Sequence, residues 1–383
     1  MYDVAIVGVG QSVFSRNSGT STRELGFEAF KEAMNGLKIS KEDIDASVIS
    51  YTPEYDKQRT PSALVTEYLE LVPKPTFNVE TACSSSTTGL HVAWALVKSG
   101  LYKIVVIVGI QKMSELTSRE VAEIMGRGAD VMWESPFGLG MPSGHALYAC
   151  AHMAKYGTTE AQLAKIRVKN SHYAVSNPKA TYRKEVTLEE VLNSEAISSP
   201  LKKFDCCANA DGASCVIIAS KDVAKEITDK PIWIAGIGSG SNTMSLSGRD
   251  SHTSFLSTRE AAKRAYGMAG VGPADIDVAE VHDCFTIAEI LAYEDLGFAK
   301  PGEGPRLIDE RGTYLEGRIP VNVDGGLLCK GHPIGATGGS QIRTIVRQLR
   351  GEAVEAQVKN AEIGLAHNVG GIGHYAFVTI LRR

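Results

Sequence analysis

The sequence predicts an α/β fold made of two similar βαβαβ halves with one inserted segment. Three ordered features of the first half recur in the second half, at offsets of 228, 236 and 232 residues. This nearly constant spacing indicates an internal duplication. The strand–helix–strand order of each copy predicts mostly buried sheets with right-handed crossovers. Residues 116–199 break the pattern, which predicts the insert.

The repeated features are a strand, the start of a helix and a second strand. The first strand carries glycines among apolar residues, and the helix start reads Ser-Thr-Arg-Glu in both copies, which is typical of an N-cap or capping box. An Asp-Ile-Asp triplet precedes the second strand in both copies. The matching segments are 4–10 with 232–238, 21–24 with 257–260, and 43–45 with 275–277.

A strand-to-helix turn late in each half extends this correspondence. Residues 75–79 predict a short strand before Cys83, and apolar residues at helical spacing follow as far as Gly100. In the second half, the glycine-rich residues 331–339 lead into a predicted helix. Pseudo-symmetry is therefore expected to bring Cys83 and His332 to a shared central cleft.

The predicted organisation is one compact body with three parts. Residues 1–115 and 200–225 form the N-terminal half, 116–199 an inserted, partly helical lid, and 226–383 the C-terminal half. No linker or low-complexity tract separates independent domains.

Composition excludes several classes of protein. The 383 residues are 43% hydrophobic and 22% charged, which suits a globular protein with a large core, and the net charge of -4 argues against nucleic-acid binding. No apolar run is long enough to span a bilayer, and the N-terminus reads as a strand and not as a leader peptide. Seven cysteines without a CxxC pair indicate reduced thiols, so we expect a cytoplasmic location.

Cys83 is the main candidate nucleophile. It lies at a predicted helix N-terminus, where free N–H groups and the helix dipole favour a thiolate, so we expect a lowered thiol pKa. Most free cysteines are buried small hydrophobes. The Ser/Thr cluster that follows Cys83 suits a cap or a site better than an apolar core, which favours the nucleophile.

Four segments together resemble the thiolase superfamily, most closely the sterol-carrier-protein-type and archaeal thiolases. They are Cys83, residues 281–285, residues 331–333 and residues 367–373. The resemblance runs over essentially the whole chain, including the insert. It implies the duplicated, five-layered αβαβα thiolase fold with an inserted loop domain, and acetyl-CoA C-acetyltransferase activity.

The resemblance also assigns roles at the first half-site. Cys83 accepts the acyl group, and His332 is the base that takes its proton. Because Pro333 and glycines surround His332, we expect an exposed, rigidly aimed ring. The N–H groups of Gly370 and Cys83 form an oxyanion hole for the acyl-enzyme carbonyl.

A second group of residues serves the condensation. His282 occupies the position where many thiolases carry an oxyanion-hole asparagine, and Cys284 resembles the cysteine that this branch uses as acid and base. The usual second cysteine is replaced by Asn368, which cannot abstract a proton. Residues 282 and 284 would share one face of a strand, so both side chains can point into one cleft.

The implied reaction is a ping-pong condensation of two acetyl-CoA molecules to acetoacetyl-CoA and CoA through acyl-Cys83. The CoA thioester is a substrate, and we expect no metal and no tightly bound cofactor.

Other signals are weaker. Ser245 and Ser247 lie in a Gly/Ser loop that could touch pantetheine amides, while Arg167 and Arg183 are expected to be solvated surface charges. The glycine pairs lack a complete dinucleotide fingerprint, which argues against NAD. We expect Cys206 and Cys207 in the core, and the three insert histidines at structural or surface positions: His145, His152 and His172.

Three alternatives remain open on the sequence. A decarboxylating ketoacyl-synthase-like enzyme would use Cys83 with two histidines but would not need Cys284. A 3-ketoacyl-CoA thiolase of lipid degradation differs only in its acyl pocket. A non-catalytic thiolase-like scaffold subunit does not need the candidate catalytic side chains, which are Cys83, His282, Cys284 and His332.

The resemblance also implies partners. We expect a homodimer or tetramer. Archaeal relatives are associated with a hydroxymethylglutaryl-CoA synthase and a zinc-ribbon/OB-fold protein that bridges the two enzymes, which would place this chain in the mevalonate pathway of isoprenoid biosynthesis.

Overall fold

The structure is a computed structural model that describes residues 3–55 and 57–383. Met1 and Tyr2, which precede the first predicted strand, lie outside the described residues. Within the described part of the chain, no helix is both long enough and apolar enough to cross a membrane.

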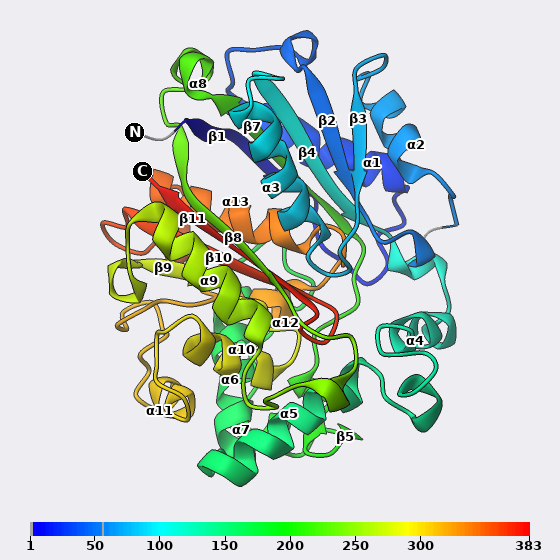
Figure 1. Cartoon of the computed structure of the whole chain (residues 1–383), viewed down its shortest axis with the longest axis vertical. Helices are drawn as coiled ribbons and strands as arrows, with labels where there is room; N and C mark the ends of the chain where they lie inside the picture. The colour runs from blue at the N-terminus through cyan, green and yellow to red at the C-terminus, as the bar shows by residue number, and fades with distance from the viewer. Residues whose placement is uncertain (1–2, 56) are drawn as a thin grey trace.

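Nine strands form one mixed sheet in the order β3-β2-β4-β7-β1-β8-β11-β10-β9 (Figure 1). Among the described strands only β2–β3, β2–β4 and β9–β10 pair in parallel, so the sheet is less parallel than the strand–helix–strand pattern suggests. The strands are β1 Val4–Gln11, β2 Ala46–Ser50, β3 Thr76–Val79, β4 Ile104–Gln111, β7 Gly212–Ser220, β8 Ile232–Ser241, β9 Val278–Glu280, β10 Ile363–Gly370 and β11 Tyr375–Arg382. A separate small pair joins β5 Ala196–Ser198 and β6 Leu201–Lys202.

The helices follow the same duplicated plan. In the first half they are α1 Thr22–Met34, α2 Pro61–Tyr68, α3 Ser85–Lys98 and α8 Lys221–Ile227, and in the insert α4 Ser118–Gly126, α5 Met141–Tyr156, α6 Glu160–Ala174 and α7 Leu188–Leu192. The second half contains α9 Leu256–Ala269, α10 Thr286–Asp295, α11 Gly304–Asp309, α12 Gly326–Lys330 and α13 Thr337–Arg350.

The strand order confirms the duplication. Reading outward from the centre, β1-β7-β4-β2 in one half corresponds to β8-β11-β10-β9 in the other. The two halves of the sheet meet through only two residue pairs of β1 and β8, Ala5 with Trp233 and Ile6 with Ile232. The Asp-Ile-Asp triplets serve the same purpose in both copies. The carboxylate of Asp45 accepts the N–H of Ile104 at the start of β4, and that of Asp277 accepts the N–H of Ile363 at the start of β10.

Glycines in the first strand of each copy let a helix approach closely. A side chain at Gly10 would lie 2.0 Å from the Ala29 carbonyl oxygen of α1, and one at Gly238 would lie 2.0 Å from the Ala261 carbonyl oxygen of α9. These glycines are therefore needed for packing and do not form a nucleotide site, which explains the incomplete fingerprint.

One predicted helix start is confirmed and the other is wrong. Ser21 and Glu24 form the capping box of α1. In the second copy α9 begins at Leu256 with Phe255 as its N-cap, and the hydroxyl of Ser257 donates to the carbonyl of Gly373. The helix therefore starts before the repeated tetrapeptide, and Ser257 ties α9 to the loop after β10.

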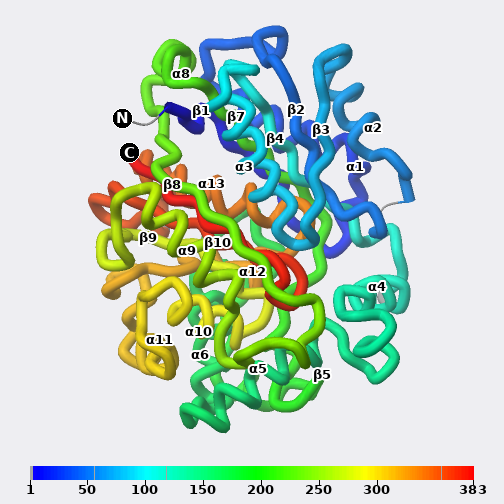
Figure 2. The backbone as a smooth tube through the Cα atoms, in the orientation of Figure 1, coloured from blue at the N-terminus to red at the C-terminus, as the bar shows by residue number. Residues whose placement is uncertain are grey.

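The molecule has five layers, as expected. Side chains of α3 and α13, among them Leu90 and Ile342, share one apolar cluster with both halves of the sheet, so these two helices form the middle layer. Helix α1 covers the other face of the first half, and α9 and α10 cover the other face of the second half (Figures 1 and 2).

Helices α5 and α6 of the insert pack onto the second half. Tyr148 of α5 and Ile166 of α6 are fully buried in the same apolar cluster as Ile290 and Leu291 of α10. Figure 1 shows α5, α6 and α7 gathered beneath the sheet, next to α10. This packing places insert residues close to the centre of the molecule.

Candidate active site

Cys83 and His332 lie where the two middle-layer helices begin. Cys83 immediately precedes Ser84, the N-cap of α3, and His332 lies five residues before Thr337, the first residue of α13. Small side chains bring these helix ends together, since the amide of Gly339 donates to the hydroxyl of Ser86 at 2.9 Å. The duplication thus delivers Cys83 and His332 to one site, as predicted.

Hydrogen bonds fix the turn that carries Cys83. The hydroxyl of Ser85 accepts the N–H of Thr81 and donates to the carbonyl of Ala82 at 2.6 Å. Ala82 has φ +52°, an uncommon value for a residue with a side chain, and such strain is common next to functional groups. Residues 84–87 are buried, but their hydroxyls bond the turn and the contact between the helix ends, which fits the expectation of a cap or a site.

The predicted low pKa of Cys83 is wrong. Burial raises the pKa of the Cys83 thiol to about 12, although the backbone N–H groups of Gly371 and Cys83 itself oppose this rise. The helix N-terminus therefore does not produce a resting thiolate. At neutral pH, Cys83 is a thiol that needs a base.

His332 can act as that base. Burial lowers its pKa to about 3, so the ring is neutral, and it is buried where we expected it to be exposed. Its Nδ1 lies 2.6 Å from the Thr337 hydroxyl, which donates to the carbonyl of Pro333. Because that hydroxyl has one hydrogen, Nδ1 must carry the ring proton, which leaves Nε2 as a proton acceptor.

His282 offers a hydrogen-bond donor where His332 offers an acceptor. The side-chain amide of Asn368 donates to its Nδ1 at 2.9 Å, and the hydroxyl of Thr87 donates to the amide oxygen of Asn368. The Nε2 of His282 must therefore carry the proton and act as a donor. Burial and the neighbouring His332 lower the pKa of His282, so this ring is also neutral.

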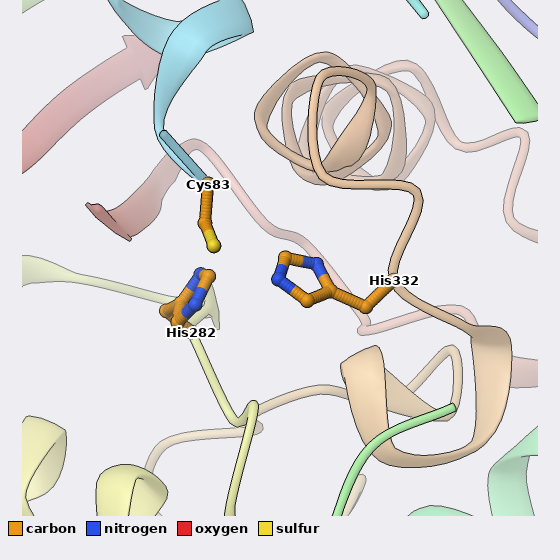
Figure 3. Close-up of side chains that lie close together, drawn as sticks. All are labelled: Cys83, His282 and His332. Carbon is orange, nitrogen blue, oxygen red and sulfur yellow. The ribbon is translucent and has the colours of Figure 1, made fainter. Parts of the chain in front are cut away.

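Figure 3 shows Cys83, His282 and His332 pointing toward one another from three segments. The sulfur and one nitrogen of each ring lie within 4.8 Å of each other, and the rings are 5.1 Å apart and nearly perpendicular. Neither Nε2 has another hydrogen-bond partner among the described residues. One thiol thus faces one acceptor and one donor. The sulfur and the two ring nitrogens are also close enough together to bind one metal ion. That the enzyme needs no metal therefore stays a prediction.

Cys284 is buried beside this group, though not on a strand. Strand β9 ends at Glu280, so residues 282 and 284 lie in the loop before α10 and the strand-face argument is wrong. The Sγ of Cys284 lies 3.6 Å from the Nε2 of His145 in the insert. Burial raises the pKa of Cys284, and the nearby Cys207 and Cys83 add to this effect.

Asp283 holds the loop between His282 and Cys284. Its carboxylate accepts the N–H groups of Leu327 and Leu328 in α12, and the side-chain amide of Asn170 in α6. Burial raises the pKa of Asp283 to about 7, and the neighbouring Glu289 adds to this rise. The loop is therefore tied both to the insert and to the helix that leads to His332.

Three residues contact predicted site residues or hold their loop, which the sequence did not show: Asn368, Asp283 and His145. The replacement of a cysteine by Asn368 was noticed, but nothing in the sequence shows that its amide reaches His282. His145 was read as structural or surface, since a single histidine on a helix carries no signal of its partner. His152 is buried against Thr158 and Glu294, and His172 is exposed beside Glu185.

The remaining predicted positions differ in their surroundings. Gly370 packs against the carbonyl of Thr81, and the amide that reaches the Cys83 sulfur is that of the adjacent Gly371. The hydroxyl of Ser245 donates to Glu134 of the insert and bonds the hydroxyl of Ser247, so both serines help to anchor the insert.

The weaker expectations have different outcomes. Arg167 is not a solvated charge but is buried, donating to the carbonyl of Leu328 and lying over the rings of Tyr182 and Phe204, whereas Arg183 is exposed. Cys206 and Cys207 are half-buried and pack against the apolar cluster of the second half, and the N–H of Cys207 donates to the carbonyl of Cys284.

Comparisons with known proteins identify the family of the chain. Residues 4–222 match the family model described as thiolase, N-terminal domain, and residues 238–383 match the one described as thiolase C-terminal domain-like. An acetyl-CoA acetyltransferase from Methanothermobacter thermautotrophicus is 40% identical over the whole of both chains. Sterol carrier protein 2 from Bos taurus is 33% identical over 99% of this chain and 72% of its own length.

Among solved structures, one described as the Ltp2-ChsH2(DUF35) aldolase is similar with a TM-score of 0.86 and 27% sequence identity. The match covers 99% of this chain and 97% of that chain.

Proposed function

The chain belongs to the thiolase family and is an acyltransferase, and from this premise we propose that it is an acetyl-CoA C-acetyltransferase that condenses two acetyl-CoA molecules to acetoacetyl-CoA. The observation that supports this most strongly is the Cys83–His282–His332 group, in which a thiol meets one proton acceptor and one proton donor. The 40% identity to an acetyl-CoA acetyltransferase favours acetyl groups as the substrate.

In the first half-reaction, the thiol of Cys83 gives its proton to the Nε2 of His332 while the sulfur attacks the acetyl carbonyl. The backbone N–H groups of Cys83 and Gly371, which lie near the sulfur, donate hydrogen bonds to the developing oxyanion. Gly371 thus takes the place that was predicted for its neighbour Gly370. The proton on His332 then passes to the leaving thiolate, so that CoA departs as a thiol and Cys83 carries the acetyl group.

In the second half-reaction, the thioester oxygen of another acetyl-CoA accepts a hydrogen bond from the Nε2–H of His282. Cys284, acting as a thiolate, removes the α-proton, and the resulting carbanion attacks the acyl-Cys83 carbonyl. Cys83 leaves as a thiolate and regains the proton that Cys284 removed. General acid–base groups of this kind contribute about 100- to 10,000-fold to a rate.

The CoA thioester is a substrate in this scheme, and no step of it uses a tightly bound cofactor or a metal. We therefore expect full activity after dialysis against a chelator.

A 3-ketoacyl-CoA thiolase that accepts longer or branched chains is the second candidate. The 33% identity to the benzoylsuccinyl-CoA thiolase subunit BbsB from Thauera aromatica, over 96% of this chain, favours it, because that relative's name gives a larger acyl group than acetyl. A ketoacyl-synthase-like enzyme would not need Cys284, so its activity would survive Cys284→Ala. A scaffold subunit would show no activity in the wild type.

The experiment is thiolysis of acetoacetyl-CoA by free CoA, compared with a series of longer 3-ketoacyl-CoA substrates. The proposal predicts the highest kcat/KM for acetoacetyl-CoA, no activity in Cys83→Ala, and in Cys284→Ala acylation of Cys83 without condensation. A preference for longer chains supports the second candidate. Undiminished condensation by Cys284→Ala, or activity only with malonyl substrates, would count against a thiolase with this base.

We further propose a cytoplasmic homodimer or tetramer that feeds the mevalonate pathway of isoprenoid biosynthesis. It would act in complex with a hydroxymethylglutaryl-CoA synthase and a zinc-ribbon/OB-fold bridging protein. Support comes from the 40% identity to an archaeal enzyme and from a similar structure described with a DUF35 partner. Co-purification from native cells followed by mass spectrometry tests this, and a chain recovered as a monomer without such partners contradicts it.

A further inference from the structure

His145 is an insert residue that contacts a proposed catalytic side chain. It lies in the first turns of α5, its side chain is 1% exposed, and its Nε2 is 3.6 Å from the Sγ of Cys284. This distance is within hydrogen-bond range for a thiol. The scheme above leaves one question open, which is how Cys284 becomes a thiolate.

The hydrogen bonds of His145 define which nitrogen is protonated. Its Nδ1 lies 2.8 Å from the carbonyl oxygen of Met141, one helical turn earlier. A carbonyl only accepts, so Nδ1 must carry the ring proton, and Nε2 is a free acceptor that faces the Cys284 thiol. This is the same arrangement as that of His332 toward Cys83.

Packing holds the ring in this position. The imidazole stacks on Phe285, the residue after Cys284, with ring centres 4.3 Å apart and planes 25° apart. One residue earlier in α5, Gly144 packs against Ile372 of the loop that carries Gly371. Tyr148, one turn later, accepts a hydrogen bond from Arg249 at 2.7 Å. The helix, the Cys284 loop and the loop beside Cys83 therefore form one packed unit.

Electrostatics keep the resting pair neutral. Burial, together with the positive charge of Arg249 and the neighbouring His374, lowers the pKa of His145 to about 4. Around Cys284, burial raises the thiol pKa, together with Cys207, Cys83 and Asp283. The proton therefore stays on sulfur until a substrate occupies the site.

We propose that His145 is the proton acceptor for Cys284, so that the site contains two Cys–His pairs, one for acyl transfer and one for enolisation. The proposal rests on the proposed function in taking Cys284 as the condensation base. The Cys284 S–H bond breaks as its proton moves to the Nε2 of His145, and the thiolate then removes the α-proton of acetyl-CoA. After Cys284 has passed that proton to the departing Cys83 thiolate, His145 returns its own proton to Cys284, and both pairs are restored.

The test measures two properties of His145→Gln, a variant that keeps a polar side chain but cannot accept the proton. The first is loss of deuterium from the methyl group of deuterated acetyl-CoA, which reports enolisation, compared with acetylation of Cys83, which reports the first half-reaction. The second is the pH profile of iodoacetamide alkylation at Cys284, read by mass spectrometry in a Cys83→Ala background. His172→Gln, at an exposed histidine of the same insert, is the matched control.

We expect His145→Gln to lose about 100-fold in deuterium exchange while acetylation of Cys83 changes less than about threefold. Alkylation of Cys284 at pH 7 to 8 should slow by about tenfold. Adding His145→Gln to Cys284→Ala should cost nothing more, because residues that act as a unit are not additive. His172→Gln should match the wild type in every assay.

Equal losses in both half-reactions, or unchanged exchange and unchanged alkylation, would overturn the proposal. If His145→Gln does not fold, His145→Asn, which is smaller, takes its place in the same assays. A failure of the proposed function can be told apart from a failure of this inference. If Cys284 is not the condensation base, Cys284→Ala exchanges deuterium at the wild-type rate. The alkylation profile of Cys284 reports in either case whether His145 and Cys284 are paired.

Discussion

At the scale of single residues, the site works with neutral groups. Cys83 is a thiol, because burial raises its pKa to about 12, and His332 is a neutral imidazole, because burial lowers its pKa to about 3. A thiolate–imidazolium pair would require both shifts to be reversed. The proton therefore moves only when the substrate arrives.

This account predicts how alkylation of Cys83 depends on pH. The reactive species is the thiolate, so the rate of iodoacetamide modification should rise about tenfold for each pH unit between pH 7 and pH 9.5, without a plateau near neutrality. Mass spectrometry of the Cys83 peptide gives the rate. A plateau below pH 7 would reveal a preformed ion pair and contradict the neutral description.

The orientation of His332 depends on Thr337, whose hydroxyl oxygen accepts a hydrogen bond from the Nδ1–H of the ring. Thr337→Val removes that acceptor with little change in volume. We expect about a 10- to 100-fold loss of kcat/KM for thiolysis, a size typical of groups that orient a functional histidine. Thr337→Ser keeps the hydroxyl and should retain most of the activity. Equal activity of the valine variant would show that Thr337 does not orient the ring.

At the scale of secondary-structure elements, the two halves use the same contact between a strand and a helix. A methyl group at Gly238 would lie 2.0 Å from a backbone carbonyl of α9. We expect Gly238→Ala to lower the free energy of unfolding by more than about 3 kcal/mol. Urea or guanidinium denaturation measures the change.

The control lies on the helix itself. Gly267 in α9 has open space around it, and alanine there should be neutral or stabilising by up to about 1 kcal/mol. If Gly238→Ala and Gly267→Ala changed the free energy of unfolding equally, close packing of the strand against α9 would not explain the loss at Gly238.

Elements were predictable from the sequence where the pattern is local. The strand before Cys83, the capping box at Ser21 and Glu24, and both Asp-Ile-Asp triplets lie where the sequence places them. The start of α9 was missed because Ser257 bonds to Gly373, more than 100 residues away. The same reason applies to Asn368 and His145, whose partners come from distant segments that no local pattern records.

At the scale of the whole molecule, the two halves depend on each other. Helices α3 and α13 lie between the two halves of the sheet, and the insert packs on the second half. We therefore expect a single thermal transition in scanning calorimetry, with the calorimetric and van't Hoff enthalpies in agreement for one cooperative unit. Two separated transitions would show that the halves or the insert unfold independently.

The duplication and the convergence of Cys83 and His332 followed from the sequence, because a repeat fixes where equivalent turns meet. The protonation states did not follow from it. They depend on burial, which arises only when the middle layer and the insert close around the site, and this is why the expected thiolate at the start of α3 is absent.

The central claim is that Cys83 alone carries the acyl group while Cys284 handles the second proton. The most direct measurement is brief incubation with acetyl-CoA, acid quenching and mass spectrometry of every cysteine peptide, in the wild type and in Cys284→Ala. The account predicts one acetyl group on Cys83 in both proteins, and acetoacetyl-CoA from the wild type only. An acetyl group on Cys284 or Cys207, or none on Cys83, would contradict it.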